Sequence, residues 1–507
     1  MMRRFISICV VGLICAHAFA GDEPALDVLR LTASSSDTDP GLPWQRLRPS
    51  VQNGYAIRVD VNHAVTTERL VRNASVIHLA PARSGNRIRA SVVHSDIQVN
   101  LALLRMEDAS ALPSRNAALP IMSASVVLTN LTVVQFDETD DTQTGSARFL
   151  KASVSSLPAS PHMCLLLTLQ TQLNVNGEGA PVLEENNLAG LVMQYDTSTR
   201  TASVLPAQTV DRFIRDTLAP PYEGFPALGI EWAPLVDPAK RAFLDAPTNN
   251  CGIQVLDCLP FSGASNTLQP NDVIMQLDGY DIDSLGYYRD PDFGRLGFAH
   301  IVKELHKPGD TVPVTVIRER KPLELQLTLG RRSEADDLVP DNLAAQPDDY
   351  MISGGCLIRE LTARYLFAHG SDWSLKTDPR IVHDFFFRRR RPERQGDRIV
   401  IISRVLPDPI NQGYQNIQDA IITHANGLPI RNMEDVFAVR NRDGVIARLR
   451  LMGFETELCF ATNATAGADQ RLIRQYRLPA LSRHSARPVA DRNEGNPQSL
   501  IPGALKR

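Results

Sequence analysis

Short apolar runs separated by polar turns dominate the chain between residues 51 and 214. Evenly spaced runs of this kind occupy, among others, residues 54–59, 74–79, 88–93, 101–106, 164–169 and 188–193. Alternating or short continuous apolar runs bounded by turn residues are typical of half-buried strands, and many such strands at even spacing are typical of a barrel or sandwich. The pattern predicts a mainly β domain over residues 51–219.

One helix is expected in this domain, over residues 206–218. Val210, Phe213 and Ile214 have helical spacing and would share one buried face. Thr209 has the side chain of a helix N-cap and is expected to cap this helix.

Two further units follow the first domain. The linker-like residues 220–224 introduce a unit over 225–330, which combines strand patterns with a helical stretch containing Phe298, Ile301 and Val302. The polar residues 331–349 read as a second linker, and a third unit spans 350–462. Residues 463–507 are expected to form a C-terminal extension whose polar tail, from Ser482, is disordered.

The first twenty residues have the pattern of an export signal. Arg3 and Arg4 precede an apolar run over 5–16, and 18–20 (Ala-Phe-Ala) fits the small-x-small cleavage rule. We expect cleavage after Ala20, an N-terminal extension over 21–50, and a periplasmic or secreted protein. An uncleaved N-terminal anchor is the alternative.

Composition narrows the class of protein. Of the 507 residues, 43% are hydrophobic and 22% charged, and the formal net charge is −4. These values exclude a mostly disordered chain and a multi-span membrane protein, and they do not favour nucleic-acid binding. The five cysteines beyond residue 20 form no CxxC or Cys/His cluster with metal-ligand spacing, so no metal site is expected. No phosphate loop or dinucleotide fingerprint occurs either, and no cofactor is expected. Most are expected to be buried thiols, because an extended run between Cys251 and Cys258 would hold them too far apart for a disulfide.

Motifs in the second and third units carry a family resemblance. Leu228-Gly229-Ile230, and later Asp272-Val273-Ile274 with Asp278-Gly279, resemble the first PDZ domain of HtrA/Deg proteins. Residues 372–373 (Asp-Trp), 401–406, 410–414 and 426–427 resemble the second PDZ domain of plant-type Deg proteins. The resemblance implies a trypsin-like double β-barrel followed by two PDZ domains.

The same resemblance implies a peptide-binding function. Leu228, Gly229 and Ile230 would form the loop that binds a peptide carboxylate, with Val255 behind the groove, and the peptide would add as an extra strand. Unfolded or C-terminal segments of other proteins are then the expected partners. Because members of the family assemble as oligomers, the resemblance also implies a homo-oligomer or co-assembly with an active Deg paralogue.

The resemblance also locates a catalytic triad, and all three of its positions are substituted. A trypsin-like protease needs a Ser nucleophile, a His base and an Asp that orients the His. Arg69 stands in the His position, Asn100 in the Asp position, and Glu178 in the Ser position within Gly177-Glu178-Gly179-Ala180-Pro181-Val182. Arginine remains protonated and cannot act as a general base near neutral pH.

Other arrangements of these residues stay open. Arg69 and Glu178 are predicted to form an ion pair in the former cleft, the alternative being that each points into solvent. Asp96 would take the Asp position only after a register shift, or would pair with Glu178 as a second carboxylate. His63 and His78, near the substituted His position, are interpreted as ordinary surface or core histidines.

A run of four arginines, 388–391, follows three phenylalanines at 385–387. A solvated basic loop is the favoured interpretation, and an anionic partner or the acidic face of a neighbouring subunit is the alternative.

Three functional hypotheses follow. The first is an exported pseudoprotease that binds peptides through its PDZ domains in protein quality control. The second is an active serine endopeptidase. The third is a scaffold or regulatory subunit that assembles with an active relative.

Overall fold

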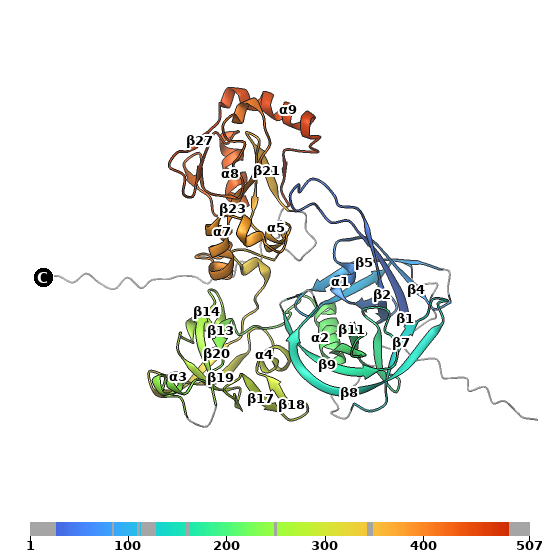
Figure 1. The fold of residues 1–507 in the computed structure, drawn as a ribbon. Coiled ribbons are helices and arrows are strands. Elements are labelled where there is room, and N and C mark those ends of the chain that lie inside the picture. The colour runs from blue at the N-terminus through green and yellow to red at the C-terminus, as the bar shows by residue number, and fades with distance from the viewer. Residues whose placement is uncertain are drawn as a thin grey trace, which may run out of the picture.

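The computed structural model describes residues 27–83, 86–108, 112, 128–158, 160, 162–247, 251–341 and 348–485 (Figure 1). Two closed six-stranded barrels lie side by side, followed by a middle unit and a third unit that are each built on one main sheet. The predicted mainly β class with a double barrel is confirmed. The proposed signal at 1–20 lies outside the described residues.

The first barrel has the strand order β1-β2-β3-β6-β5-β4. Its strands are β1 (Val28–Ser35), β2 (Ser50–Arg58), β3 (His63–Thr66), β4 (Ala74–Pro81), β5 (Ile88–Asp96) and β6 (Leu101–Met106), with the one-turn helix α1 (Glu68–Val71) after β3. The barrel therefore begins before residue 51, because β1 pairs with both β2 and β4 and closes the sheet. Leu29, Leu31 and Ala33 show the period-two burial of a barrel strand, in a segment that the sequence analysis assigned to an extension.

The second barrel has the order β10-β11-β12-β9-β8-β7. Its strands are β7 (Leu131–Phe136), β8 (Thr142–Ser156), β9 (Met163–Thr171), β10 (Pro181–Glu184), β11 (Asn187–Asp196) and β12 (Thr201–Pro206). The helix α2 (Ala207–Leu218) follows and buries Val210, Phe213 and Ile214, as expected. Thr209 does not cap it: α2 begins directly after Pro206, and the Thr209 hydroxyl donates to Glu304 Oε2 at 3.0 Å.

The middle unit is a sheet of order β13-β14-β15-β19-β20, with β16 paired to β15 and a separate hairpin β17–β18. Its elements are β13 (Ile230–Ala233), α3 (Pro238–Phe243), β14 (Ile253–Cys258), β15 (Val273–Leu277), β16 (Tyr280–Asp281), β17 (Tyr287–Asp290), β18 (Gly294–Gly297), α4 (Ala299–Leu305), β19 (Thr311–Arg318) and β20 (Lys321–Thr328). Ile301 and Val302 of α4 pack against Val255, Val314 and Leu327 of the sheet and bury the core of this unit.

The third unit is a sheet of order β27-β26-β24-β23-β22-β21-β28, with β25 paired to β24. Its strands are β21 (Tyr350–Ser353), β22 (Cys356–Glu360), β23 (Val400–Val405), β24 (Ala420–Ala425), β25 (Leu428–Pro429), β26 (Arg448–Leu451), β27 (Leu458–Cys459) and β28 (Ser482–Arg483). Its helices are α5 (Ala363–Phe367), α6 (Trp373–Lys376), α7 (Pro379–His383), α8 (Met433–Asp443) and α9 (Thr465–Tyr476).

The expected disordered tail is corrected at its start. Ser482 and Arg483 are ordered as β28, because they pair with Met351 and Tyr350 of β21. The helix α9 before them is anchored by Leu472, which is fully buried in a cluster with Tyr350 and Leu478. Residues 486–507 lie outside the described part of the chain.

The run of four arginines at 388–391 forms ion pairs within the chain, and one of them joins the third unit to the middle unit. Arg391 forms ion pairs with Glu231 of β13 and Asp257 of β14. Arg389 pairs with Asp341, and Arg388 lies 3.3 Å from both Asp384 and Glu393. The solvated-loop interpretation is therefore wrong for Arg389 and Arg391, which pair with acidic residues of the same chain, whereas the Arg388 side chain is exposed.

Cysteine burial is mixed. Cys164 and Cys356 are buried, Cys251 and Cys258 are half-buried, and Cys459 is exposed, so the expectation that most are buried is wrong. None of the five takes part in a disulfide within the described residues. No helix in the described ranges is both long and apolar enough to cross a membrane.

Candidate functional site

Arg69, Asn100 and Glu178 meet between the two barrels. Arg69 lies on α1, Asn100 ends the turn before β6, and Glu178 lies in the loop before β10. The barrels place these three residues together although 109 positions separate the first from the last. The three positions assigned to the triad from sequence therefore form one cluster.

The cluster is a closed polar network centred on Glu178. The Arg69 guanidinium forms an ion pair with Glu178 Oε2, as predicted, and Asn100 Nδ2 donates to Glu178 Oε1 at 2.8 Å. Asn100 Oδ1 accepts the backbone N–H of Arg69 at 2.9 Å. Only 4% of the Glu178 side chain is exposed, against 41% for Arg69, so the carboxylate is buried and the cation covers it from the solvent side.

The backbone around Glu178 is held by close contact with β2. Tyr55 N–H donates to Glu178 O at 3.0 Å, and a Cβ on Gly54 would lie 2.6 Å from that same oxygen. Gly179 has φ +81°, and a Cβ there would meet Tyr55 O at 2.5 Å. Glycine at both positions lets the loop approach the strand, and this fixes the Glu178 side chain toward Arg69 and Asn100.

These residues cannot perform nucleophilic acyl transfer in the manner of a triad. The carboxylate replaces the hydroxyl nucleophile, and a guanidinium replaces the imidazole that would take its proton. Asn100 provides hydrogen bonds but no charge that would stabilise a protonated base. The cluster therefore has the geometry of a structural ion pair.

Asp96 is occupied elsewhere. Its Oδ1 accepts the N–H of Gln98 at 2.7 Å and its Oδ2 accepts the hydroxyl of Tyr222 at 2.6 Å. Burial beside Asp96 raises the pKa of the Tyr222 hydroxyl, so this group remains a donor. His63 lies 2.9 Å from Asp60 at the start of β3, and His78 lies on β4.

A second candidate site lies in the middle unit, between β13 and α4. A groove of about 230 Å³ is lined by Leu228, Gly229, Ile230 and Trp232 on one side and by Phe298, Ala299 and Val302 on the other. Gly229 has φ +74°, and a Cβ there would meet the Ser262 side chain at 2.2 Å. Val255, expected behind the groove, is fully buried in the core of the unit.

The barrel supplies part of the wall of this groove. Gln98, His162 and Met163 line it together with Lys303 of α4. The Lys303 ammonium donates to Gln98 O at 2.6 Å and to Met163 O at 3.0 Å, which ties α4 to the β5–β6 turn of the first barrel and to β9 of the second. Sequence reasoning missed this wall, because more than 130 positions separate Lys303 from its partners and no periodic pattern marks such a contact.

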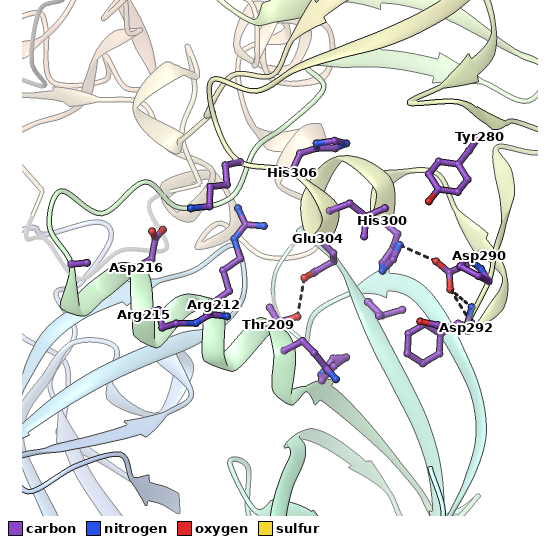
Figure 2. A pocket seen from close by; sticks show the side chains of 18 residues that line it. Thr209, Arg212, Arg215, Asp216, Tyr280, Asp290, Asp292, His300, Glu304 and His306 are labelled. Atoms are coloured by element: carbon purple, nitrogen blue, oxygen red, sulfur yellow. Dashed lines mark hydrogen bonds and ion pairs between the residues drawn. The ribbon is translucent and has the colours of Figure 1, made fainter. Parts of the chain in front are cut away.

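A further pocket lies between α2 and the middle unit (Figure 2). It encloses about 650 Å³ and contains none of the site residues predicted from sequence. Figure 2 shows Thr209 of α2 directed at Glu304 of α4, and Asp290 directed at His300. Tyr288 links this pair, since its hydroxyl lies 2.8 Å from Asp290 Oδ2 and 2.5 Å from His300 Nδ1. The Thr209–Glu304 hydrogen bond joins α2 to α4, whereas the contacts among Asp290, Tyr288 and His300 fix α4 to the β17 strand of the middle unit.

Comparison with known proteins finds one matching domain profile and several similar proteins. The sequence profile of the PDZ domain matches residues 339–485. The chain is 25% identical over 419 residues to protease Do-like 2, chloroplastic, of Arabidopsis thaliana, covering 80% of this chain and 66% of that protein. It is 23% identical over 405 residues to putative protease Do-like 3, mitochondrial, of the same plant, covering 78% and 68%. The chain is thus similar to protease Do-like (HtrA/Deg) proteins over most of its length.

Among solved structures, HtrA-type protease AlgW with decapeptide aligns with a TM-score of 0.46 and 16% identity, over 61% of this chain and 96% of that chain. The chain spans about two thirds of the length of these two curated relatives. Within the described residues, no group of three His, Cys, Asp or Glu side chains is arranged to hold a metal ion.

The Glu178 network predicts a measurable loss of stability in this protein when its charge is removed. Glu178→Gln leaves Arg69 without a counterion and weakens the hydrogen bonds to the carboxylate. Because Arg69 is partly solvated, we expect a cost of about 1–2 kcal/mol, below the value for a fully buried pair. This corresponds to a fall of about 2–8 °C in the melting temperature of the barrel domain, measured by differential scanning calorimetry.

Two further variants test whether this loss comes from the pair. Glu138→Gln, at an exposed turn position, should leave the melting temperature unchanged. Arg69→Met/Glu178→Met should cost less than the two single changes added together, because removing both charges leaves no unpaired ion. Strict additivity of the single changes would show that the two side chains do not interact.

The groove wall predicts a pH effect on stability. Burial, together with the charge of Lys303, lowers the pKa of His162 to about 4. An unfolded histidine takes up a proton near pH 6.5, whereas folded His162 stays neutral until about pH 4. Between these two pH values the unfolded state binds more protons, so the free energy of unfolding falls as the pH drops from about 6.5 toward 4 and is unaffected by His162 above pH 6.5. His162→Gln should reduce the drop in melting temperature between pH 7 and pH 5. The exposed His383→Gln should not, and an unchanged drop in the His162 variant would contradict the assignment.

Proposed function

We propose that this protein is an exported HtrA/Deg-like pseudoprotease that binds extended or C-terminal peptide segments at the groove between β13 and α4. Its role would be in protein quality control, either alone or as a regulatory subunit of an assembly with an active relative. Active serine endopeptidase function is the alternative that the experiments below would reveal.

The contacts of Glu178 are the observation that supports the proposed loss of proteolysis. The position of the nucleophile is held by Glu178, whose two carboxylate oxygens are engaged by Arg69 and Asn100. Triad loss costs many orders of magnitude in rate even where substrate binding is kept. Three substitutions that satisfy one another electrostatically support a site maintained for stability and not for catalysis.

Peptide binding is supported by the shape and edge of the middle sheet. β13 is the terminal strand of its sheet, and the groove beside it is lined by apolar side chains from Leu228, Ile230, Phe298 and Val302. An extended peptide added to such an edge gains main-chain hydrogen bonds, while the apolar groove receives its side chains. The loop at Gly229 would bind the terminal carboxylate through backbone N–H groups.

Export is supported by the first twenty residues alone. Arg3, Arg4, the apolar run over 5–16 and the small residues before Gly21 match a cleavable signal. A periplasmic or secreted location would give the groove access to unfolded exported proteins.

The first test of this proposal is cleavage of casein by the purified mature protein. We expect no cleavage by the wild type, and none by Glu178→Ser, because Arg69 cannot take the proton of a restored serine. A relative with an intact triad provides the positive control. Cleavage that serine-protease inhibitors abolish would overturn the assignment of the triad, and inhibitor-resistant cleavage that co-purifies with the chain would indicate a different catalytic group.

The second test measures peptide binding at the groove. A labelled peptide with an apolar C-terminal residue, selected on an array, should bind the wild type and lose at least tenfold in affinity in Gly229→Ala. The new Cβ would clash with Ser262 and distort the loop. The matched control is Gly279→Ala, which has a similar positive φ of +77° but open space around its Cβ. Equal affinity of the amidated peptide, or of the two variants, would contradict binding of a carboxylate at Gly229.

A further inference from the structure

The third unit repeats the core of the middle unit. In the middle unit, β13-β14-β15-β19-β20 form the sheet and α4 lies between β15 and β19 in the chain. In the third unit, β22-β23-β24-β26-β27 follow the same order and α8 lies between β24 and β26. By this correspondence β22 stands where β13 stands, and α8 where α4 stands.

The space beside β22 is already filled by the chain itself. β21 pairs antiparallel with β22 from Tyr350 opposite Arg359 to Ser353 opposite Cys356, through a turn at Gly354 and Gly355. Met351 of β21 is 3% exposed and belongs to the same core cluster as Val436 and Phe437 of α8. A peptide that paired with β22 would therefore have to displace β21 and open this core.

The outer edge of β21 is in turn covered by the segment 480–485. Tyr350 and Met351 pair with Arg483 and Ser482. Ile352 N–H donates to Leu481 O at 2.7 Å, and the N–H of Ser485 donates to Asp349 Oδ1 at 2.7 Å. The segment thus adds to β21 as a strand, in the same manner in which an external peptide extends a sheet.

Side chains also hold this segment. The His484 ring stacks on Phe437 of α8 with 4.1 Å between centroids, and its Nε2 lies 2.9 Å from Glu434 Oε1. The Arg483 guanidinium lies 5.5 Å from the centre of the Tyr350 ring, and it donates to Pro43 O at 3.0 Å. Aromatic stacking and cation–π contacts give such a segment selectivity beyond its main-chain bonds.

We propose that the edge of β21, together with Phe437 and Glu434 of α8, is a strand-binding site whose occupant is the chain's own segment 480–485. The ligand class is an extended peptide that carries a basic residue followed by a ring. The site is displaceable, because β28 pairs over only two residues and Ser482 and His484 are exposed. This inference concerns a different edge from the groove at Gly229 and does not depend on peptide binding there.

The test uses the full chain and a labelled, C-terminally amidated peptide with the sequence of residues 478–485. Arg483→Ala/His484→Ala removes both side-chain anchors from the segment. Its exposed neighbour on α9, Arg474→Ala, is the matched control. Amide exchange at Ile352, followed by mass spectrometry, reports whether the edge of β21 is open, and fluorescence polarisation reports peptide binding.

We expect the Ile352 amide to exchange at least tenfold faster in the double variant, and the peptide to bind that variant at least tenfold more tightly than the wild type or Arg474→Ala. His484→Ala alone, expected to give about a threefold effect, serves if the double variant does not fold. Unchanged exchange at Ile352, or equal peptide binding by wild type and variant, would overturn the proposal. Adding Gly229→Ala should leave this binding unchanged, which separates it from binding at the middle unit.

Discussion

A buried carboxylate between the two barrels sets the main constraint on this molecule. Glu178 is almost completely removed from water, and an isolated charge in that position would cost several kcal/mol. Arg69 neutralises it, and Asn100 satisfies the second oxygen while accepting the backbone N–H of Arg69. Since one residue comes from α1, one from the turn before β6 and one from the loop before β10, the network ties both barrels to a single arrangement. The three residues thus act as a cross-link between the two barrels.

Polar contacts of the same kind fix the units that follow. Lys303 joins α4 to both barrels through the backbone carbonyls of Gln98 and Met163, and Tyr222 in the linker donates to the buried Asp96 of β5. Arg391 reaches from the third unit to two carboxylates on the edge of the middle sheet. Each contact contributes little free energy to stability where it is partly solvated, but together they hold the wall of the β13 groove in place.

The middle and third units use one sheet in two ways. The β13 edge remains terminal in its sheet and lies along an apolar groove, whereas the corresponding edge of β22 is covered first by β21 and then by β28. An unpaired strand edge invites association with other chains, and covering it with a strand of the same chain removes that liability. Under our proposals, the middle unit binds peptides from other proteins, whereas the third unit binds segment 480–485 of its own chain.

The sequence by itself determined the elements whose cause is local, and it selected Arg69, Asn100 and Glu178, which the structure brings together. Alternating apolar residues gave the barrel strands, helical spacing gave the buried face of α2 at Val210, Phe213 and Ile214, and the Gly177–Val182 frame identified Glu178 well enough to predict its ion pair with Arg69. The tertiary structure alone decided the rest. It placed β1 in the first barrel, directed Thr209 to Glu304 instead of to a cap, gave Arg391 its partners and made β28 from a polar tail. Each of these features depends on a partner from a distant part of the chain, and neither periodicity nor composition identifies that partner. A polar side chain is equally well solvated by water until the fold brings its partner close.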